Sequence, residues 1–477
     1  MKKILIAAAL VGTGVSAQAA DLATKAPIYK APVLAAYNWT GFYLGVNAGV
    51  GFGRSYTQLS NSIAGAGADS QNRLGGLGAL GGGQIGYNWQ YGNILGFNNV
   101  VFGLEADIQG TSFRDDRTCA IECVGALGVA YDQKLDWFGT VRGRVGLASG
   151  PVLTYFTGGF AYGGVKTTIT DFAAPALATT FSDTRTGWTI GSGVEAALGG
   201  NWTGKIEYLY LDLGTQTGTA LLPNSYVYAS EIREHIFRLG LNYRIGGTGL
   251  YAPEPVANWA GWYIGGNFGG ATALNRSSLV SQPTPPLLVN EQFNLTPDGW
   301  LGGGQVGYNW QAANWVFGLE ADIQGSTQKD DKVCAVVCAA PITFAAFDQK
   351  MQWFGTVRGR IGYSVGSTLF YATGGFAYGG VKTHVAGVFG VPFDQTFSRT
   401  RTGYTVGGGI ESPFDVFGLF GRNWTAKTEY LFIDLGRADD FVSVAGATGF
   451  AFSTKVQEHV MRTGLSYHFN SPVIAKY

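Results

Sequence analysis

The 477-residue chain contains one long unit written twice, and this repeat limits its possible folds more than any other feature. The segment Gly-Leu-Glu-Ala-Asp-Ile-Gln-Gly at 103–110 returns unchanged at 318–325. Solenoid repeats are only about 20–50 residues long. A repeat of this length therefore predicts a duplicated domain, with one copy over 38–245 and the other over 258–469.

Each copy has the residue pattern of β-strands. Within 102–109, Phe, Leu, Ala and Ile alternate with Gly, acidic and amide residues, and a period of two is typical of a strand. We expect eight such segments per copy, each of about ten residues or slightly more, which is the length of a tilted membrane-spanning strand. In the first copy they are expected at 41–53, 80–90, 100–110, 136–148, 152–166, 185–198, 202–213 and 235–245.

The connections between these segments alternate in length. The stretches 54–77 and 111–134 are long, whereas 148–151 and, in the second copy, 311–314 are short. Long loops at one end and tight turns at the other are typical of an outer-membrane barrel. This pattern predicts extracellular long loops and periplasmic termini.

Composition excludes several other classes of protein. Only 13% of residues are charged, and 32 basic residues balance 32 acidic ones, so there is no basic excess for nucleic acid. Outside the N-terminus no apolar run reaches the ~18 residues of a spanning helix. Aromatic residues at strand ends, such as Trp39, Tyr43 and Trp89, indicate an interfacial girdle. A soluble secreted β-protein remains the alternative, because alternation alone does not separate the two.

The polar strand face carries a balanced set of charges in each copy. Charges removed from water must be paired, and eight strands leave an interior that side chains fill. We therefore expect structural ion pairs inside each barrel, with an ion path or proton relay as the alternative. The expected interior charges are Glu105, Asp107, Arg142, Arg144, Glu195, Lys205, Glu207 and Arg238 in the first copy, and Glu320, Asp322, Arg358, Arg360, Glu411, Lys427, Glu429 and Arg462 in the second.

The linker between the copies helps to decide whether their strands form two barrels or one. Residues 246–257 exceed the short turns, and Tyr-Ala-Pro at 251–253 resembles the approach segment of the first copy. We expect an all-β fold of two tandem eight-stranded, up-and-down antiparallel barrels. One sixteen-stranded barrel is the alternative, and it would hold a water channel.

The two ends of the chain lie outside the repeats. A basic start, an apolar stretch and a small-x-small site predict a signal peptide over 1–19. Residues 20–37 are expected to form a periplasmic leader, and 470–477 a C-terminal tail.

Cysteine and histidine residues are the candidates for disulfide, metal or catalytic chemistry. Paired cysteines in a loop of an exported protein indicate local disulfides rather than a metal site, and the four are Cys119, Cys123, Cys334 and Cys338. His235 and His459 each follow a glutamate near the expected start of the last strand. No nucleophile accompanies them in a repeated pattern, so we expect neither catalysis nor a cofactor.

Several motifs together resemble a known family. They include Asn-Trp-Thr-Gly-Phe-Tyr-Leu-Gly at 38–45, Gly-Gly-Gln-Ile-Gly-Tyr-Asn-Trp at 82–89 and Thr-Val-Arg-Gly-Arg-Val-Gly at 140–146. The chain resembles the alphaproteobacterial outer-membrane β-barrel proteins of the RopB type, also described as outer-membrane immunogenic proteins. The resemblance implies an OmpA-like eight-stranded barrel in the outer membrane, without a known reaction. The duplication departs from the family, which usually has a single barrel.

These observations predict a structural outer-membrane protein that supports envelope integrity and surface interaction. Its expected partners are outer-membrane lipid and lipopolysaccharide, together with the assembly machinery that reads a last strand ending at Phe469. The alternatives are a porin of sixteen strands and a surface binder acting through the long loops. The resemblance implies haemin as an example of such a surface ligand, since some relatives bind it, but it carries no haemin motif onto residues of this chain.

Overall fold

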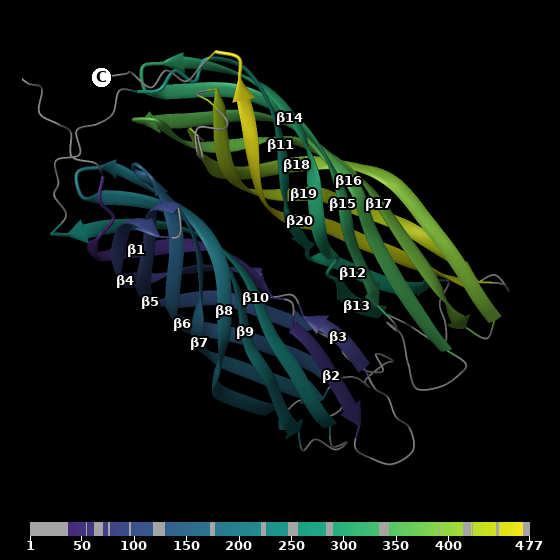
Figure 1. Ribbon diagram of the computed structural model, residues 1–477. Helices are drawn as coiled ribbons and strands as arrows, with labels where there is room; N and C mark the ends of the chain where they lie inside the picture. The colour runs from purple at the N-terminus through teal and green to yellow at the C-terminus, as the bar shows by residue number, and fades with distance from the viewer. Residues whose placement is uncertain are drawn as a thin grey trace, which may run out of the picture. The chain divides into compact units, whose positions relative to one another are not determined.

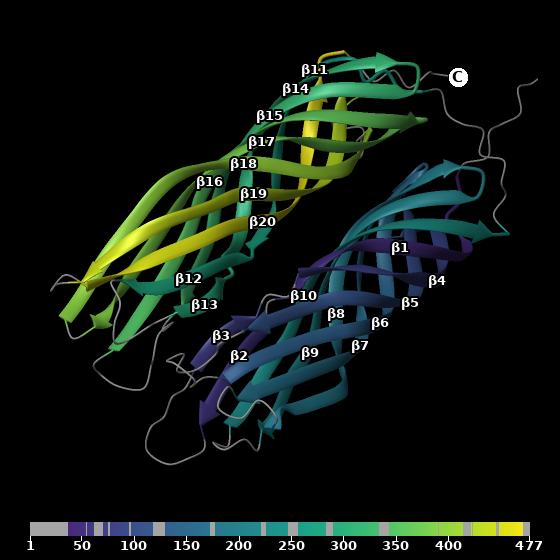
Figure 2. The same ribbon diagram turned by 180° about the vertical axis from the view of Figure 1, so that it is seen from behind.

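The computed structural model consists of β-strands arranged as two separate closed sheets, one per copy (Figures 1 and 2). No helix among the described residues has the length and apolar character needed to span a membrane. The described residues are 37–53, 55–61, 70–74, 77–94, 97–117, 129–171, 177–220, 226–246, 256–282, 290–332, 343–389, 391–413, 421, 423–444 and 448–470.

The first sheet is an eight-stranded barrel with a small added hairpin. Its first and last strands pair antiparallel, from Phe42 opposite Ile245 to Gly53 opposite Glu234, and this seam closes the ring. The strands are β1 (Gly41–Gly53), β4 (Leu77–Ile94), β5 (Phe97–Arg117), β6 (Val129–Ser149), β7 (Val152–Asp171), β8 (Thr179–Gly199), β9 (Trp202–Ala220) and β10 (Tyr226–Ile245), with the hairpin β2 (Ser55–Asn61) and β3 (Ser70–Leu74).

The second sheet repeats this topology strand for strand, and its own seam pairs the first strand with the last, from Tyr263 opposite His468. The expectation of two eight-stranded barrels is therefore confirmed, and the sixteen-stranded alternative is not observed among the described strands. Its strands are β11 (Gly261–Ala273), β12 (Asn275–Gln282), β13 (Asn290–Leu295), β14 (Asp298–Ala312), β15 (Trp315–Lys332), β16 (Thr343–Val365), β17 (Thr368–Phe389), β18 (Val391–Pro413), β19 (Trp424–Val444) and β20 (Thr448–His468).

The strands run further toward the long-loop end than the sequence indicated. The expected loop 111–134 is in large part strand, because β5 continues to Arg117 and β6 begins at Val129. The register shifts by one residue between Gly110 and Phe113, and such a bulge restarts the alternation in a new phase. The expected loop 54–77 likewise contains the β2–β3 hairpin.

The outer face changes character along each strand, as β7 illustrates. Phe156 and Phe160 are large, exposed apolar side chains in the half near the tight turns. Further along the same face come Lys166 and then the hydroxyl residue Thr168. An apolar band followed by a polar extension is what a membrane barrel of about 25 Å hydrophobic height requires when its strands project beyond the bilayer.

Candidate functional site: the buried charge layer

The expected interior charges all lie inside the barrels. Each of the sixteen residues is at most 5% exposed. In the first barrel they come from five strands: β5, β6, β8, β9 and β10. Residues two apart on a strand share a face, and this spacing aims Glu105 and Asp107, or Arg142 and Arg144, at the same interior.

Arg142 is at the centre of the first layer. Its guanidinium nitrogens contact Asp107 at 2.7 Å and Glu207 at 3.2 Å, and they also reach Glu105. Arg238 contacts the same Asp107 at 2.8 Å and donates its Nε–H to Glu207 at 2.6 Å. Two arginines and three carboxylates therefore form one continuous network rather than separate pairs.

The remaining charges extend this network. The Lys205 ammonium lies 2.8 Å from a Glu105 oxygen. Arg144 contacts Glu195 at 3.0 Å and donates its Nε–H to the Asn88 side-chain oxygen at 2.8 Å. Four acids and four bases thus balance within the layer, and this balance offsets the cost of removing the ions from water.

Two buried tyrosines, which are not among the interior residues predicted from the sequence, complete the layer. Tyr43 donates its hydroxyl proton to Glu105 and Tyr155 donates to Glu207, both at 2.8 Å. The Arg144 guanidinium lies 4.7 Å from the Tyr43 ring centroid, a cation–π contact. A Cβ at Gly86 would overlap the Tyr43 ring, so this glycine makes room for it. The alternation of Tyr43 with outward-facing neighbours was the signal for its inward position.

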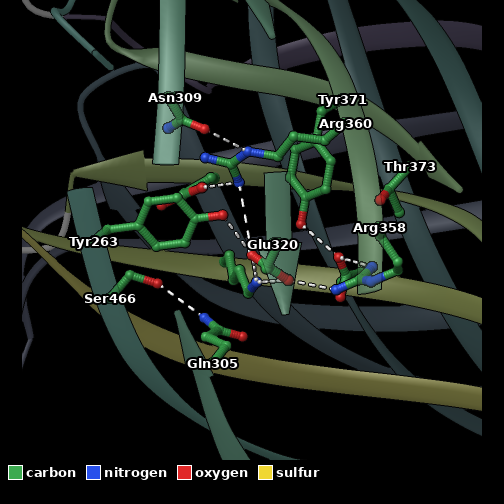
Figure 3. Close-up of polar contacts among 12 residues, drawn as sticks. Tyr263, Gln305, Asn309, Glu320, Arg358, Arg360, Tyr371, Thr373 and Ser466 are labelled. Carbon is green, nitrogen blue, oxygen red and sulfur yellow. Dashed lines mark hydrogen bonds and ion pairs between the residues drawn. The ribbon is translucent and has the colours of Figure 1, made fainter. Parts of the chain in front are cut away.

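The second barrel has the same eight charged residues and two tyrosines at matching positions, and Figure 3 shows part of this layer. Arg358 contacts Glu429 at 2.9 Å and Asp322 at 3.0 Å, and it also reaches Glu320. Tyr263 donates to Glu320 at 2.7 Å, and Tyr371 to Glu429 at 3.1 Å. The two copies therefore share one interior design.

The copies differ around one carboxylate. In the first barrel, the Asn242 amide donates to Glu195 at 2.8 Å. In the second, Ser466 stands at the matching position, and the imidazole of His468 donates to Glu411 at 2.9 Å instead. His468 thus belongs to the layer, whereas its counterpart Arg244 bonds backbone carbonyls of the approach segment.

Apolar side chains close each layer at both ends. Near the tight turns of the first barrel, Trp39 is fully buried, clusters with Val101 and Leu153, and donates its indole N–H to the Gly150 carbonyl at 3.2 Å. The prediction that Trp39 and Tyr43 belong to an interfacial girdle is therefore wrong. Both side chains point inward because the strand alternation begins before Gly41.

On the other side of the first layer, large apolar residues fill the barrel. Phe113, Phe138 and Leu211 belong to one buried cluster there, and each is at most 3% exposed. The second barrel has the same arrangement, with Trp259 near the turns and Phe354 and Leu431 beyond the charges. The charged layers lie between apolar layers.

The glutamate–histidine pairs do not form a reactive site. His235 lies well inside β10 rather than at its start, and its Nδ1 is 2.8 Å from the Tyr208 hydroxyl oxygen. Successive residues of a strand point to opposite faces, so Glu234 and His235 are directed apart. His459 makes the same contact with Tyr430 in the second barrel, at 2.8 Å.

Other expected sites lie partly beyond the described residues. The four cysteines, the signal peptide at 1–19 and most of the linker and tail fall outside them. Among the residues that the structure describes, no group of three or more His, Cys, Asp or Glu is arranged to hold a metal ion.

Comparisons with known proteins agree with this architecture. The model of the family described as "Outer membrane protein beta-barrel domain" matches twice, over residues 5–244 and 247–469. The chain is 38% identical over 254 residues to a 31 kDa outer-membrane immunogenic protein of Brucella melitensis biotype 1, covering 51% of this chain and all of that protein. It is 36% identical over 220 residues to a 22 kDa outer membrane protein of Rhizobium leguminosarum bv. viciae, covering 45% and 81%.

Solved structures include Neisserial surface protein A, at 13% identity and a TM-score of 0.21, with 43% of this chain and 98% of that one covered. The double family match and the relative covered over its whole length agree with the two closed rings of strands. The chain is an outer-membrane protein that belongs to the outer-membrane β-barrel family of immunogenic proteins, with the family's domain present twice in tandem.

Proposed function

We propose that this protein is a structural component of the outer membrane that supports envelope integrity and surface interaction, and that its barrels do not conduct. The observation that carries the proposal is the charge layer of each barrel, in which ion-paired side chains at most 5% exposed lie between apolar clusters. A solute path needs a continuous aqueous lumen, and eight strands leave an interior only wide enough for side chains.

Single-channel recording in planar bilayers tests this proposal on the full-length protein. We expect no stable conductance. A matched variant, Arg142→Ala with Arg358→Ala, removes the central side chain of both charge layers. Any current through this variant is therefore a current that the charge layers block in the unaltered protein. A large, stable conductance of the unaltered protein contradicts the proposal.

The proposed orientation places the long loops outside and the termini in the periplasm. It is supported by the exposed apolar side chains, such as Phe42 and Phe156, in the half near the tight turns. The proposed contact with the assembly machinery involves Phe469, which is 57% exposed directly after β20. Phe469→Ala should reduce the amount of folded protein in the outer membrane, whereas Ile245→Ala, at the end of the first barrel, should not.

A further inference from the structure

Three basic side chains form a row across neighbouring strands of the first barrel, and the same row recurs in the second. Arg114 on β5 lies opposite Lys134 on β6, which lies opposite Lys166 on β7. The row ends at Ser182 on β8. We call Arg114, Lys134 and Lys166 the first basic row.

The second basic row occupies the matching register. Lys329 on β15 lies opposite Lys350 on β16, and Lys350 lies opposite Lys382 on β17. Ser398 on β18 again ends it. Residue identity differs at one position, Arg114 against Lys329, but the positive charge is kept at all three.

Each row lies just beyond the aromatic edge of the apolar band. Trp137 and Tyr162 are in edge-to-face contact, with ring centroids 5.9 Å apart, and on β6 and β7 they lie nearer to the tight turns than the row does. Trp353 and Tyr378 make the same contact in the second barrel at 6.0 Å. Because Trp and Tyr concentrate at membrane–water interfaces, the rows lie at the height of the lipid headgroups.

The rows break a rule of sheet stability, since like charges directly opposite each other on paired strands are destabilising. Aspartates compensate only part of this repulsion. Arg114 pairs with Asp132 at 2.9 Å and Lys350 with Asp348 at 3.3 Å, and Asp298 lies opposite Lys329.

Other lysines of the rows are left without such compensation. Among the described residues, no ion pair joins Lys134, Lys166 or Lys382 to an acid. The side chains of Lys166 and Lys382 are exposed. Adjacent, uncompensated ammonium groups at headgroup height attract anions from outside the chain.

A further alignment of bases shows why the repetition matters. Arg437, Lys455 and Arg276 lie opposite one another in the second barrel, where Lys455 pairs with Asp434 at 3.0 Å. The matching positions of the first barrel include Glu231, opposite Thr215. This alignment is therefore not a property of both copies, whereas the basic rows are.

We propose that each basic row binds the phosphate groups of lipid A in the outer leaflet. Ammonium and guanidinium groups donate charge-assisted hydrogen bonds to phosphate oxygens, and the terminal serine hydroxyl adds a neutral donor. The proposal rests on the orientation proposed above, in which the long-loop end faces outward. It gives the protein a lipid partner at two defined sites.

The test measures lipid A bound by the full-length folded protein in vesicles of phosphatidylcholine that contain lipid A. The first variant is Lys134→Gln with Lys166→Gln, and the second is Lys350→Gln with Lys382→Gln. Each should weaken binding at its own row about thirtyfold, from the attraction that each base contributes near an anionic surface. Replacing the same lysines by arginine should preserve binding.

The matched control is Arg233→Gln with Arg399→Gln. Both are partly exposed bases that lie outside the rows and already pair with Asp212 and Asp440, and Arg399 lies opposite the buried Val381 on the inner face, so lipid A binding should be unchanged. Heat-modifiable migration on gels confirms that every variant is folded. Equal loss in the control and row variants, or no loss in the row variants, overturns the proposal.

Two further arms identify the source of the phosphate. Lipid A stripped of its phosphates should bind no more tightly to the unaltered protein than to the row variants. Inorganic phosphate should compete only weakly, because it lacks the anchored acyl chains. Strong competition by inorganic phosphate overturns the lipid assignment. Conductance recordings are independent of these arms, so a conducting protein that still binds lipid A would refute the proposed function alone.

Discussion

At the scale of single residues, one central arginine joins the carboxylates within each charge layer, Arg142 in the first barrel and Arg358 in the second. Arg142 contacts three carboxylates and is about 1% exposed. Arg142→Met should lower the free energy of unfolding by about 3–5 kcal/mol, because it leaves buried carboxylates uncompensated. Urea unfolding in lipid vesicles, followed by tryptophan fluorescence, measures this change.

The control for this prediction is Arg233→Met, which removes a base that is 41% exposed in its ion pair. Exposed pairs contribute at most about 1 kcal/mol. Similar losses for the two variants would show that the layer does not stabilise the barrel through pairing.

The exchange of partners around Glu411 gives a second residue-scale prediction. His468→Ala removes a hydrogen bond to a buried carboxylate, and we expect a loss of about 1.5–3 kcal/mol. Adding Ser466→Asn restores the donor that the first barrel uses at Asn242, so the double variant should regain much of the loss. Unfolding of both variants measures this, and the absence of any rescue would contradict the matched roles.

The sequence predicted the interior charges because strand alternation and charge balance each restrict them. It did not identify Tyr43 and Trp39 as inward, since an aromatic residue at a strand end suits a membrane interface as well as a core. Residue identity alone does not separate these environments. The direction of such a residue depends on where the inward–outward alternation of the strand begins, and the glycine at position 41 has no side chain that shows this.

At the scale of elements, the strands continue past the apolar band as a polar wall. The sequence missed this extension because bulges change the phase of the alternation, as between Leu135 and Trp137. The predicted strands therefore covered only the membrane-spanning part of each strand and not its full hydrogen-bonded length. Hydrogen bonding to neighbours on both sides continues well beyond it.

Hydrogen exchange in lipid vesicles tests this extension. Amides of 131–135 in β6 should exchange slowly although they lie outside the bilayer, because β5 and β7 both pair with that segment. Amides of β3 should exchange faster, since among the described strands β3 pairs only with β2. Rapid exchange throughout 131–135 would contradict a sheet that extends beyond the bilayer.

At the scale of the whole molecule, each barrel closes on its own first strand. The seam of the second barrel pairs β11 with β20, and both lie within that copy. We therefore expect residues 258–477, expressed behind the first 19 residues, to assemble in the outer membrane without the first copy. Heat-modifiable migration and protease resistance of the isolated copy measure this, and failure to fold would show that the copies depend on each other.

The two closed seams have a consequence for how the gene can change. Among the described residues, the strands of one copy form their ladders only with strands of the same copy, so a substitution in one needs no matching change in the other. Asn242 and Ser466 already differ, yet they face glycines at the same register, Gly45 and Gly265. The duplication thus allows the outer surface of one copy to stay the same while mutations change that of the other.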